Sequence, residues 1–431
     1  MNKNVLILGA GAREHALAWK LAQSPHLNQL FAMPGNPGIK QFALLIPGDP
    51  SDAGSVIKAV EQFQIDVVLC GPEAPLDAGI MDALQSVGWS SPPWQIGPTR
   101  QGAQLESSKA FSKAFMSRHA IPTAAYGVFT KREIDQAMEF ISQLVPPIVI
   151  KASGLAAGKG VVICDDHQQA ELEIIQMFSG KFGSASETLV IEEFLKGIEF
   201  SVFILTNGTQ YVLLPEAKDY KRIGIGDTGP NTGGMGAISP VPWASPELMQ
   251  RVRHDIIEPT LKGLSDEGIA YQGFIFFGLM VVDQQPFVIE YNCRMGDPET
   301  EAVIPRLKTD LMEIFEAMEN NTLDQMRLDI EERSAATVVV ASGGYPDSFQ
   351  KGFEMTVPET LPSGTLIFHA GTKEEHHQLL THGGRVLAIT AMDLDPRKAI
   401  NSSMEMAERI QFENKYIRKD IGRDLYPEPV S

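Results

Sequence analysis

The sequence is poor in cysteine. Three cysteines, Cys70, Cys164 and Cys293, occur far apart among 431 residues. This number and spacing exclude a disulfide framework and a zinc site built from several cysteines. Each cysteine lies at or near the end of an apolar, strand-like run, so we expect buried free thiols in a reducing compartment.

Basic residues are also in deficit. Lys and Arg number 36 against 54 Asp and Glu, which gives a formal net charge of −18. Proteins that bind nucleic acid in bulk present a basic face, so this balance argues against a nucleic-acid partner. A small anionic substrate is still compatible with it, because a site can be locally basic inside an acidic surface.

Long hydrophobic runs are missing as well. The most apolar stretch, residues 273–282, is much shorter than the ~20 residues that a membrane-spanning helix needs. The N-terminal residues MNKNVLILGAG read as a strand and a turn, so the sequence predicts neither a signal peptide nor a membrane partner. We therefore expect a cytoplasmic protein.

The length of the chain favours two to four domains. Strand and helix patterns alternate over residues 1–105, which predicts an α/β domain with a doubly wound parallel sheet. We assign residues 106–330 to a central domain, with a small subdomain at about 124–192, and residues 331–431 to a separate α+β domain. In this last domain we also expect a charged helix that carries His376 and His377.

A glycine turn at residues 9–11 follows the first predicted strand and leads into a helix. The pattern is similar to a dinucleotide-binding fingerprint, but Glu14 occupies the third glycine position, and no acidic residue ends the next strand. A helix N-terminus attracts anions, so one interpretation is a site for a substrate phosphate. The other is a purely structural turn. Because ligands gather at the carboxyl ends of parallel strands, both GAGAREH and GPEAPL are candidate binding segments.

The most informative stretch, residues 146–165, reads as a strand, a glycine-rich loop and a second strand. Gly154, Gly158 and Gly160 would let backbone N–H groups approach a ligand closely, and Lys151 and Lys159 bring positive charge to both ends. The common phosphate loop has a different pattern and opens a helix. The stretch therefore favours a flap over a polyphosphate, with an ordinary glycine-rich hairpin as the alternative.

Two further segments fit a nucleotide site. A helix at about 107–118 carries Lys109 and Lys113 on one face, which either points Lys109 at a phosphate or is simply solvated. Residues 188–199 read as a strand that ends in Glu192 and Glu193, followed by an extended hinge and Glu199. Such a hinge can offer backbone groups to an adenine and a carboxylate to a ribose; a strand with an acidic exit is the alternative.

The segment 216–240 is predicted to be a long, glycine-rich substrate loop, because loops of this length in compact domains are usually functional. Downstream, the strand FVIEYN places Glu290 and Asn292 on one face, since side chains alternate along a strand. Two oxygen ligands at this spacing suit Mg²⁺, and Arg294 continues the same parity. The alternative is a strand end whose polar residues face water.

These motifs occur in the order found in ATP-grasp enzymes: ASGLAAGKG, then EEFLKGIE, then IEYN with Arg294. Together with GAGAREHALAWKL, PGNPG, GPEAPL, GPNTGGMGA, GDPET and GGRVLAIT, they make the chain resemble the phosphoribosylamine–glycine ligase family. The resemblance runs from Val5 to Gly422. It implies an N-terminal doubly wound domain, a central ATP-grasp domain with a mobile subdomain, and a C-terminal α+β domain.

The resemblance also implies an activity. Enzymes of this family join glycine to phosphoribosylamine in purine biosynthesis, with ATP and Mg²⁺ or Mn²⁺, through a glycyl phosphate intermediate. Small-molecule substrates would be the partners, and the protein would be a monomer or a weak homodimer.

Residue roles follow from the resemblance position by position. Catalytic roles fall to Asp219, Lys221 and Arg294, and metal binding to Glu290 and Asn292. The ATP site would comprise Lys109, Lys151, Gly154, Gly158, Lys159, Gly160, Glu192, Glu193, Phe194, Leu195 and Glu199. The substrate site would comprise Gly11, Arg13, Glu14, Glu73, Asn231, Thr232, Gly233, Gly234 and Asp297.

Many ATP-grasp enzymes have a further metal carboxylate on the strand before IEYN, but here that strand, GFIFFGLMVV, has no carboxylate. We expect water, or a carboxylate from elsewhere, to complete the metal's ligands. Three other functions are compatible with parts of the sequence: a ligase of the same fold for another acid, a nicotinamide-dependent oxidoreductase, and a non-catalytic nucleotide-binding regulator.

Overall fold

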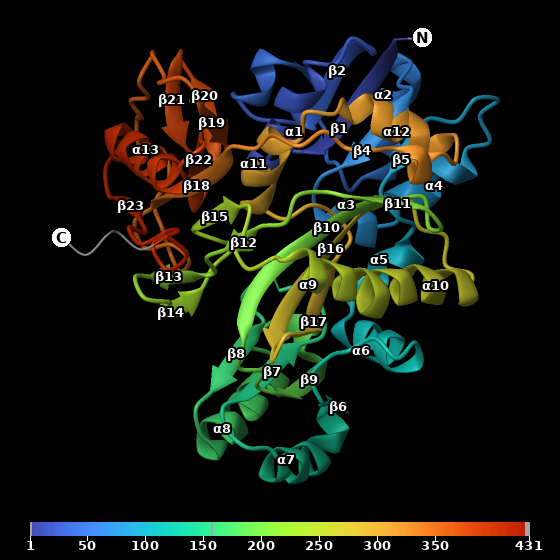
Figure 1. The fold of residues 1–431 in the computed structure, drawn as a ribbon, viewed down its shortest axis with the longest axis vertical. Coiled ribbons are helices and arrows are strands. Elements are labelled where there is room, and N and C mark those ends of the chain that lie inside the picture. The colour runs from blue at the N-terminus through green and yellow to red at the C-terminus, as the bar shows by residue number, and fades with distance from the viewer. Residues whose placement is uncertain (1, 157, 427–431) are drawn as a thin grey trace.

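The computed structural model describes residues 2–156 and 158–426 (Figure 1). Outside it lie Met1, Ala157 of the predicted glycine-rich loop, and residues 427–431 of the predicted C-terminal domain. The multidomain α/β and α+β fold that the sequence predicts is confirmed. Within the described residues, no helix combines the length and the apolar character that crossing a bilayer requires.

The N-terminal domain is built on a parallel five-stranded sheet in the order β3-β2-β1-β4-β5. Its strands are β1 (Lys3–Gly9), β2 (Leu27–Pro34), β3 (Leu44–Leu45), β4 (Val67–Cys70) and β5 (Trp94–Ile96). Its helices are α1 (Ala12–Leu21), α2 (Ala53–Phe63), α3 (Glu73–Asp77), α4 (Ile80–Ser86) and α5 (Arg100–Ser107). The strand order reverses between β1 and β4, and the N–H of Gly71 donates to the carbonyl of Leu8 there. The two candidate binding segments therefore lie side by side.

A small subdomain lies at the opposite end of the molecule (Figure 1). Its sheet, in the order β6-β9-β7-β8, consists of β6 (Tyr126–Thr130), β7 (Ile148–Ala152), β8 (Val161–Cys164) and β9 (Thr188–Glu193). Helices α7 (Ile134–Gln143) and α8 (His167–Phe178) bury their apolar faces against it. Because β7 and β8 pair antiparallel, the strand–loop–strand prediction is confirmed. Helix α6 (Lys109–Arg118), capped by Ser108, precedes the subdomain, so the predicted helix at 107–118 begins two residues later than expected.

The central sheet, in the order β11-β10-β16-β17, joins the subdomain to the rest of the molecule. It contains β10 (Ile198–Thr206), β11 (Tyr211–Leu213), β16 (Gly273–Val282) and β17 (Gln285–Asn292). Helices α9 (Pro246–Val252) and α10 (Glu258–Asp266) are joined by a π-helical turn at Arg253–Ile257. Pro259 has no N–H to donate to the preceding turn, which accounts for the local widening.

The C-terminal sheet runs β12-β15-β18-β22-β19, with β23 paired to β18. Its strands are β12 (Lys218–Asp219), β15 (Gly236–Ser239), β18 (Ser334–Ser342), β19 (Thr365–His369), β22 (Arg385–Asp393) and β23 (Lys415–Ile417), and α13 (Pro396–Arg409) packs on the sheet. Helices α11 (Glu299–Val303) and α12 (Leu311–Glu319) precede β18. The sheet thus includes two strands from inside the segment 106–330.

Two predictions about local structure are wrong. The segment 216–240 is not one long loop: it contains β12, β15 and a hairpin of β13 (Arg222–Gly224) and β14 (Thr228–Asn231). Pairing of β15 with β18 explains the difference, because a distant strand satisfies its backbone. His376 and His377 lie in no helix but form the exposed turn between β20 (Thr372–Glu375) and β21 (Gln378–Thr381). Their φ angles of 50° and 64° match the left-handed conformation of a two-residue hairpin turn.

Candidate active site

One cavity of about 1120 Å³ receives side chains from all these parts of the molecule. Every site residue assigned from the resemblance lines this cavity except Gly154 and Gly234. A Cβ on Gly154 would lie 2.8 Å from the backbone of Ala185, and one on Gly234 would lie 2.3 Å from Pro298. These two glycines therefore allow close packing beside the cavity, and the roles of all the residues in it stay predictions.

Three lysines line the cavity beneath the flap. Nζ of Lys151, in β7, lies 2.8 Å from Oε1 of Glu192. Nζ of Lys113 lies 3.1 Å from Oε2 of the same carboxylate. Lys113 is only 2% exposed, so it is not the solvated lysine that one interpretation of its helix allowed. Lys109 also faces the cavity, and burial lowers its pKa, although Glu290 opposes the shift.

Glycines shape the flap above these lysines. Gly158 has a φ of 75° and would place a Cβ 3.4 Å from the carbonyl oxygen of Thr232. A Cβ on Gly160 would lie 2.7 Å from the Cβ of Ala156. Lys159, between them, donates from Nζ to the carbonyl oxygen of Pro346 at 2.6 Å. The loop is therefore folded down onto the segments around Thr232 and Pro346.

Beyond the lysines, the lining of the cavity becomes apolar. Phe194 and Leu195 follow β9, and Ile163, Ile198 and Met280 line the same cavity. Phe194 is 36% exposed, which is unusual for a large aromatic side chain and leaves its ring accessible from the cavity. An apolar slot next to a cluster of lysines has the polarity of a nucleotide, with its base at one end and phosphates at the other.

The predicted metal residues lie on β17. A register shift in the pairing with β16 sets Glu290 opposite Gly278, where a Cβ would lie 3.0 Å from Cγ of Glu290. Burial alone would raise the pKa of Glu290, but Lys221, Lys109 and the other nearby cations lower it to about 2. Nδ2 of Asn292 is buried without a hydrogen-bond partner in the described structure.

Lys221 bridges two carboxylates next to this strand. Its Nζ lies 2.5 Å from Oε1 of Glu199 and 3.4 Å from Oε1 of Glu290. Burial opposes its charge, but Glu199, Asp219 and Glu290 raise the pKa of Lys221 well above its ordinary value. Burial raises the pKa of Asp219 well above its usual range, with Lys221 opposing and Glu299 contributing. The group thus gathers the carboxyl side chains of Glu199, Asp219 and Glu290 around one charged lysine.

Arginines dominate the side of the cavity nearest the N-terminal domain. Arg294 lies 2.6 Å from Oε1 of Glu106 and 3.5 Å from Oε2 of Glu73, while its buried Nε has no hydrogen-bond partner in the described structure. Arg13 pairs with Glu14 at 2.6 Å. Guanidinium groups held in this way can bind phosphate and carboxylate groups.

The side chain of Glu14 folds back onto the glycine turn that precedes α1. Its Oε2 accepts from the N–H of Gly11 at 2.5 Å, and a Cβ on Gly9 or Gly71 would lie within 2.7 Å of its side chain. These glycines therefore make room for the Glu14 carboxylate at the start of α1. The arrangement argues against the oxidoreductase alternative.

Several cavity residues were missed by the sequence reasoning: Glu106, Lys113 as a partner of Glu192, Trp243, Glu299, Tyr345 and Arg385. Glu106 accepts from the N–H of Cys293 at 2.7 Å and pairs with Arg294, so it fixes the end of β17. Glu106 belongs to none of the sequence motifs named above, so no local pattern indicated its place in the cavity. Arg385 stands within GGRVLAIT, which served only as a family motif.

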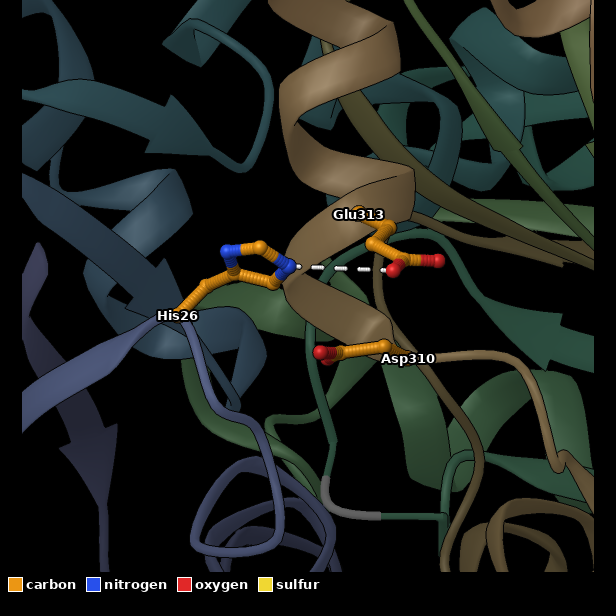
Figure 2. A group of neighbouring side chains, drawn as sticks. All are labelled: His26, Asp310 and Glu313. Carbon is orange, nitrogen blue, oxygen red and sulfur yellow. Dashed lines mark ion pairs between the residues drawn. The ribbon is translucent and has the colours of Figure 1, made fainter. Parts of the chain in front are cut away.

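A group of metal-binding residue types also lies outside the cavity (Figure 2). His26 lies 3.7 Å from Glu313, and Asp310 accepts from Ser24 and from the N–H of Met312. Asp310 thus caps α12, and Glu313 lies in the first turn of that helix, where a carboxylate is favourable. Helix capping is a sufficient explanation for this cluster.

A cationic glycine flap that faces a Glu–x–Asn strand across one cavity, beside a doubly wound domain, defines an ATP-grasp ligase. Three family models match in succession: the N domain of phosphoribosylglycinamide synthetase over residues 3–106, its ATP-grasp (A) domain over 107–300 and its C domain over 335–424. The chain belongs to the phosphoribosylglycinamide synthetase family, which confirms the resemblance inferred from its motifs.

Individual relatives agree with this assignment. The chain is 44% identical to a phosphoribosylamine–glycine ligase of Chlorobaculum tepidum, over 97% of this chain and 99% of that protein. It is 45% identical to the bifunctional purine biosynthetic protein PUR2,5 of Pichia angusta, over 99% of this chain but about half, 54%, of that protein. Its structure is similar to that of a phosphoribosylamine–glycine ligase from Thermotoga maritima, with a TM-score of 0.82, 34% identity, and coverage of 97% of this chain and 100% of that one.

Proposed function

We propose that this protein joins glycine to phosphoribosylamine with ATP, giving glycinamide ribonucleotide, ADP and phosphate in purine biosynthesis. The observation that carries the proposal is the single cavity in which Glu290 and Asn292 lie with Lys109, Lys151 and the flap. A triphosphate needs positive charge and alignment more than covalent help, and these residues supply both.

The first step is activation of glycine. The carboxylate of glycine attacks the γ-phosphate of ATP, the bond to the bridging oxygen breaks, and glycyl phosphate and ADP form. Lys151 and Lys159 hold the phosphates, and Arg294 with Lys221 binds the transferred group and the glycine carboxylate. Phe194 and Leu195 bind the adenine, and Glu199 the ribose.

The second step is attack by the amine of phosphoribosylamine on the acyl carbon, which expels phosphate. Gly11, Arg13, Glu73 and Asp297 hold this substrate at the N-terminal side of the cavity. Glycyl phosphate hydrolyses readily, so the folded-down flap and the loop 231–234 exclude water from it. Holding the two reactants together turns a bimolecular attack into a local one.

The residues present fit a divalent cation. The pKa of Glu290, lowered to about 2, keeps its carboxylate ionised, and Asn292 brings an amide side chain to the same cavity from the same face of β17. We assign Mg²⁺ or Mn²⁺ to these two residues, where the ion would neutralise charge on the polyphosphate when bound. β16 offers no carboxylate, and Glu199 and Asp219 are the nearby acidic side chains for a further ligand.

The proposal extends to the setting of the enzyme. We place domain boundaries after residues 105 and 330. This division is supported by the family models, because the N-domain model ends at residue 106, the ATP-grasp model covers 107–300 and the C-domain model begins at 335. A cytoplasmic monomer or weak homodimer, without nucleic-acid or membrane partners, fits the acidic composition and the buried free thiols.

The test is a coupled assay of ADP formation with ATP, glycine and phosphoribosylamine generated in place. We expect one ADP per glycinamide ribonucleotide, the latter identified by mass, and no sustained turnover when glycine is omitted. Glu290→Gln should reduce kcat by at least about a thousandfold while ATP still binds, and the exposed Glu313→Gln should behave as the wild type. Another amino acid that replaces glycine with higher kcat/KM would favour the alternative ligase instead.

A further inference from the structure

Two side chains of the C-terminal domain reach the active-site cavity: Tyr345, in the turn after β18, and Arg385, the first residue of β22. Neither was among the residues expected from the sequence. Both side chains hydrogen-bond to the loop 231–234, and within the described residues no hydrogen bond joins either of them to the flap or to β17.

The two residues hold Gly233 from both sides. Its N–H donates to the hydroxyl of Tyr345 at 2.9 Å, and its carbonyl oxygen accepts from Nη1 of Arg385 at 2.5 Å. A Cβ on Gly233 would lie 2.9 Å from Cζ of Arg385, so glycine is needed for the guanidinium to reach the backbone. Gly384 likewise makes room for the ring of Tyr345, because a Cβ there would lie 2.2 Å from it.

Arg385 also holds Asp297, the cavity residue of the segment before α11. Nη1 donates to the carbonyl oxygen of Asp297 at 2.7 Å, and Nη2 lies 3.1 Å from its Oδ1. The other carboxylate oxygen of Asp297 would be 3.4 Å from a Cβ on Gly11, at the start of α1. One guanidinium therefore links β22 to the loop 231–234 and to the edge of the N-terminal domain.

The position of this cluster indicates which substrate it serves. Asp297 lies within electrostatic range of Arg13, and Glu73 lies within that of Arg294, Arg13 and Arg385. Guanidinium and carboxylate groups gathered in one place suit a ligand that carries both a phosphate and an amine. The adenine slot at Phe194 and the metal strand β17 are built from other elements.

We propose that Arg385 and Tyr345 are positioning residues that hold Gly233 and Asp297 against the phosphorylated amine substrate, so that the C-terminal domain completes the site for the second step. This inference rests on the proposed function. Activation of glycine uses the flap and β17, and it should depend little on either residue.

The experiment compares Arg385→Lys and Tyr345→Phe with the wild type in full kinetic analysis. Lysine keeps the charge but loses the forked geometry, and phenylalanine removes only the hydroxyl. We expect the KM for phosphoribosylamine to rise about ten- to a hundredfold for Arg385→Lys and about three- to tenfold for Tyr345→Phe. The KM values for ATP and glycine should stay within about twofold, and the Kd of a non-hydrolysable ATP analogue should be unchanged.

Arg333→Lys is the matched control, because Arg333 pairs with Glu331 outside the cavity and should leave all three KM values unchanged. If Arg385→Lys does not fold, as judged by its circular dichroism, Tyr345→Phe decides alone. Equal changes in all KM values, or an unchanged KM for phosphoribosylamine in a folded variant, would overturn the inference. A wild type without ligase activity would instead overturn the proposed function.

Discussion

Glu301, in α11, is expected to be a neutral carboxylic acid in the folded protein. Its side chain is fully buried, and neither carboxylate oxygen has a hydrogen-bond partner in the part of the chain that the structure describes. Burial and then Asp297 hold the pKa of Glu301 well above its usual range, although Arg385 and Arg13 oppose the shift. An unpaired buried carboxylate costs several kcal/mol, so retention of the proton is favoured.

The sign of the pH dependence follows from this shift. The unfolded chain releases the proton near the ordinary pKa of 4.5, whereas the folded protein keeps it to a higher pH. The free energy of unfolding therefore falls by about 1.4 kcal/mol per pH unit above that value, until the folded pKa is reached. Glu301→Gln has the shape of the neutral acid and does not ionise. We expect it to match the wild type at the low end of this window and to be increasingly more stable above it.

Urea unfolding followed by tryptophan fluorescence, at several values between about pH 5 and 8, measures the difference in midpoint between variant and wild type. The exposed Glu359→Gln is the control and should show a difference that does not grow with pH. If Glu301→Gln were less stable than the wild type throughout the range, Glu301 would be an ionised partner of Arg385, and the reasoning would be wrong.

The site supports further predictions. Lys113→Met removes one of the two lysines on the buried Glu192 and should lower the free energy of unfolding by about 3–5 kcal/mol, measured with urea. A Cβ at Gly278 would lie 3.0 Å from Cγ of Glu290, so the larger side chain of Gly278→Val should displace the Glu290 side chain. It should therefore raise the Mg²⁺ concentration for half-maximal activity about tenfold or more, with ATP affinity retained. Phe194→Ala should raise the KM for ATP about tenfold and leave that for glycine unchanged, in steady-state kinetics. Chelation of divalent cations should abolish turnover, and added Mg²⁺ or Mn²⁺ should restore it.

Local patterns predicted much of the fold and many of the residues that gather around the flap. The flap was predictable because two apolar runs flank glycines and lysines within twenty residues, and β7 and β8 pair as expected. Glu290 and Asn292 were predictable because strand alternation alone puts them on one face. Each of these two patterns lies within one pair of neighbouring strands, so a short stretch of sequence is enough to predict it.

The remaining errors and omissions come from contacts between distant segments. The strands of the segment 216–240 form because β15 pairs with β18, about a hundred residues away. Tyr345 and Arg385 reach the cavity through the packing of the C-terminal sheet, and Lys113 is buried against Glu192 and Thr123, which come from later segments. The charged residues around His376 and His377 are typical of a polar helix. Antiparallel pairing of β20 with β21 instead makes these two histidines the turn of a hairpin.

A crystal structure with Mg²⁺, glycine and a non-hydrolysable ATP analogue tests the central claim most directly. We expect one triphosphate between the glycine-rich flap and β17, with its adenine beside Phe194, Lys151 on the phosphates, and a metal ion shared by Glu290, Asn292 and the phosphate oxygens. A nucleotide bound at the glycine turn of α1, or a metal ion held without Glu290 and Asn292, would contradict the account.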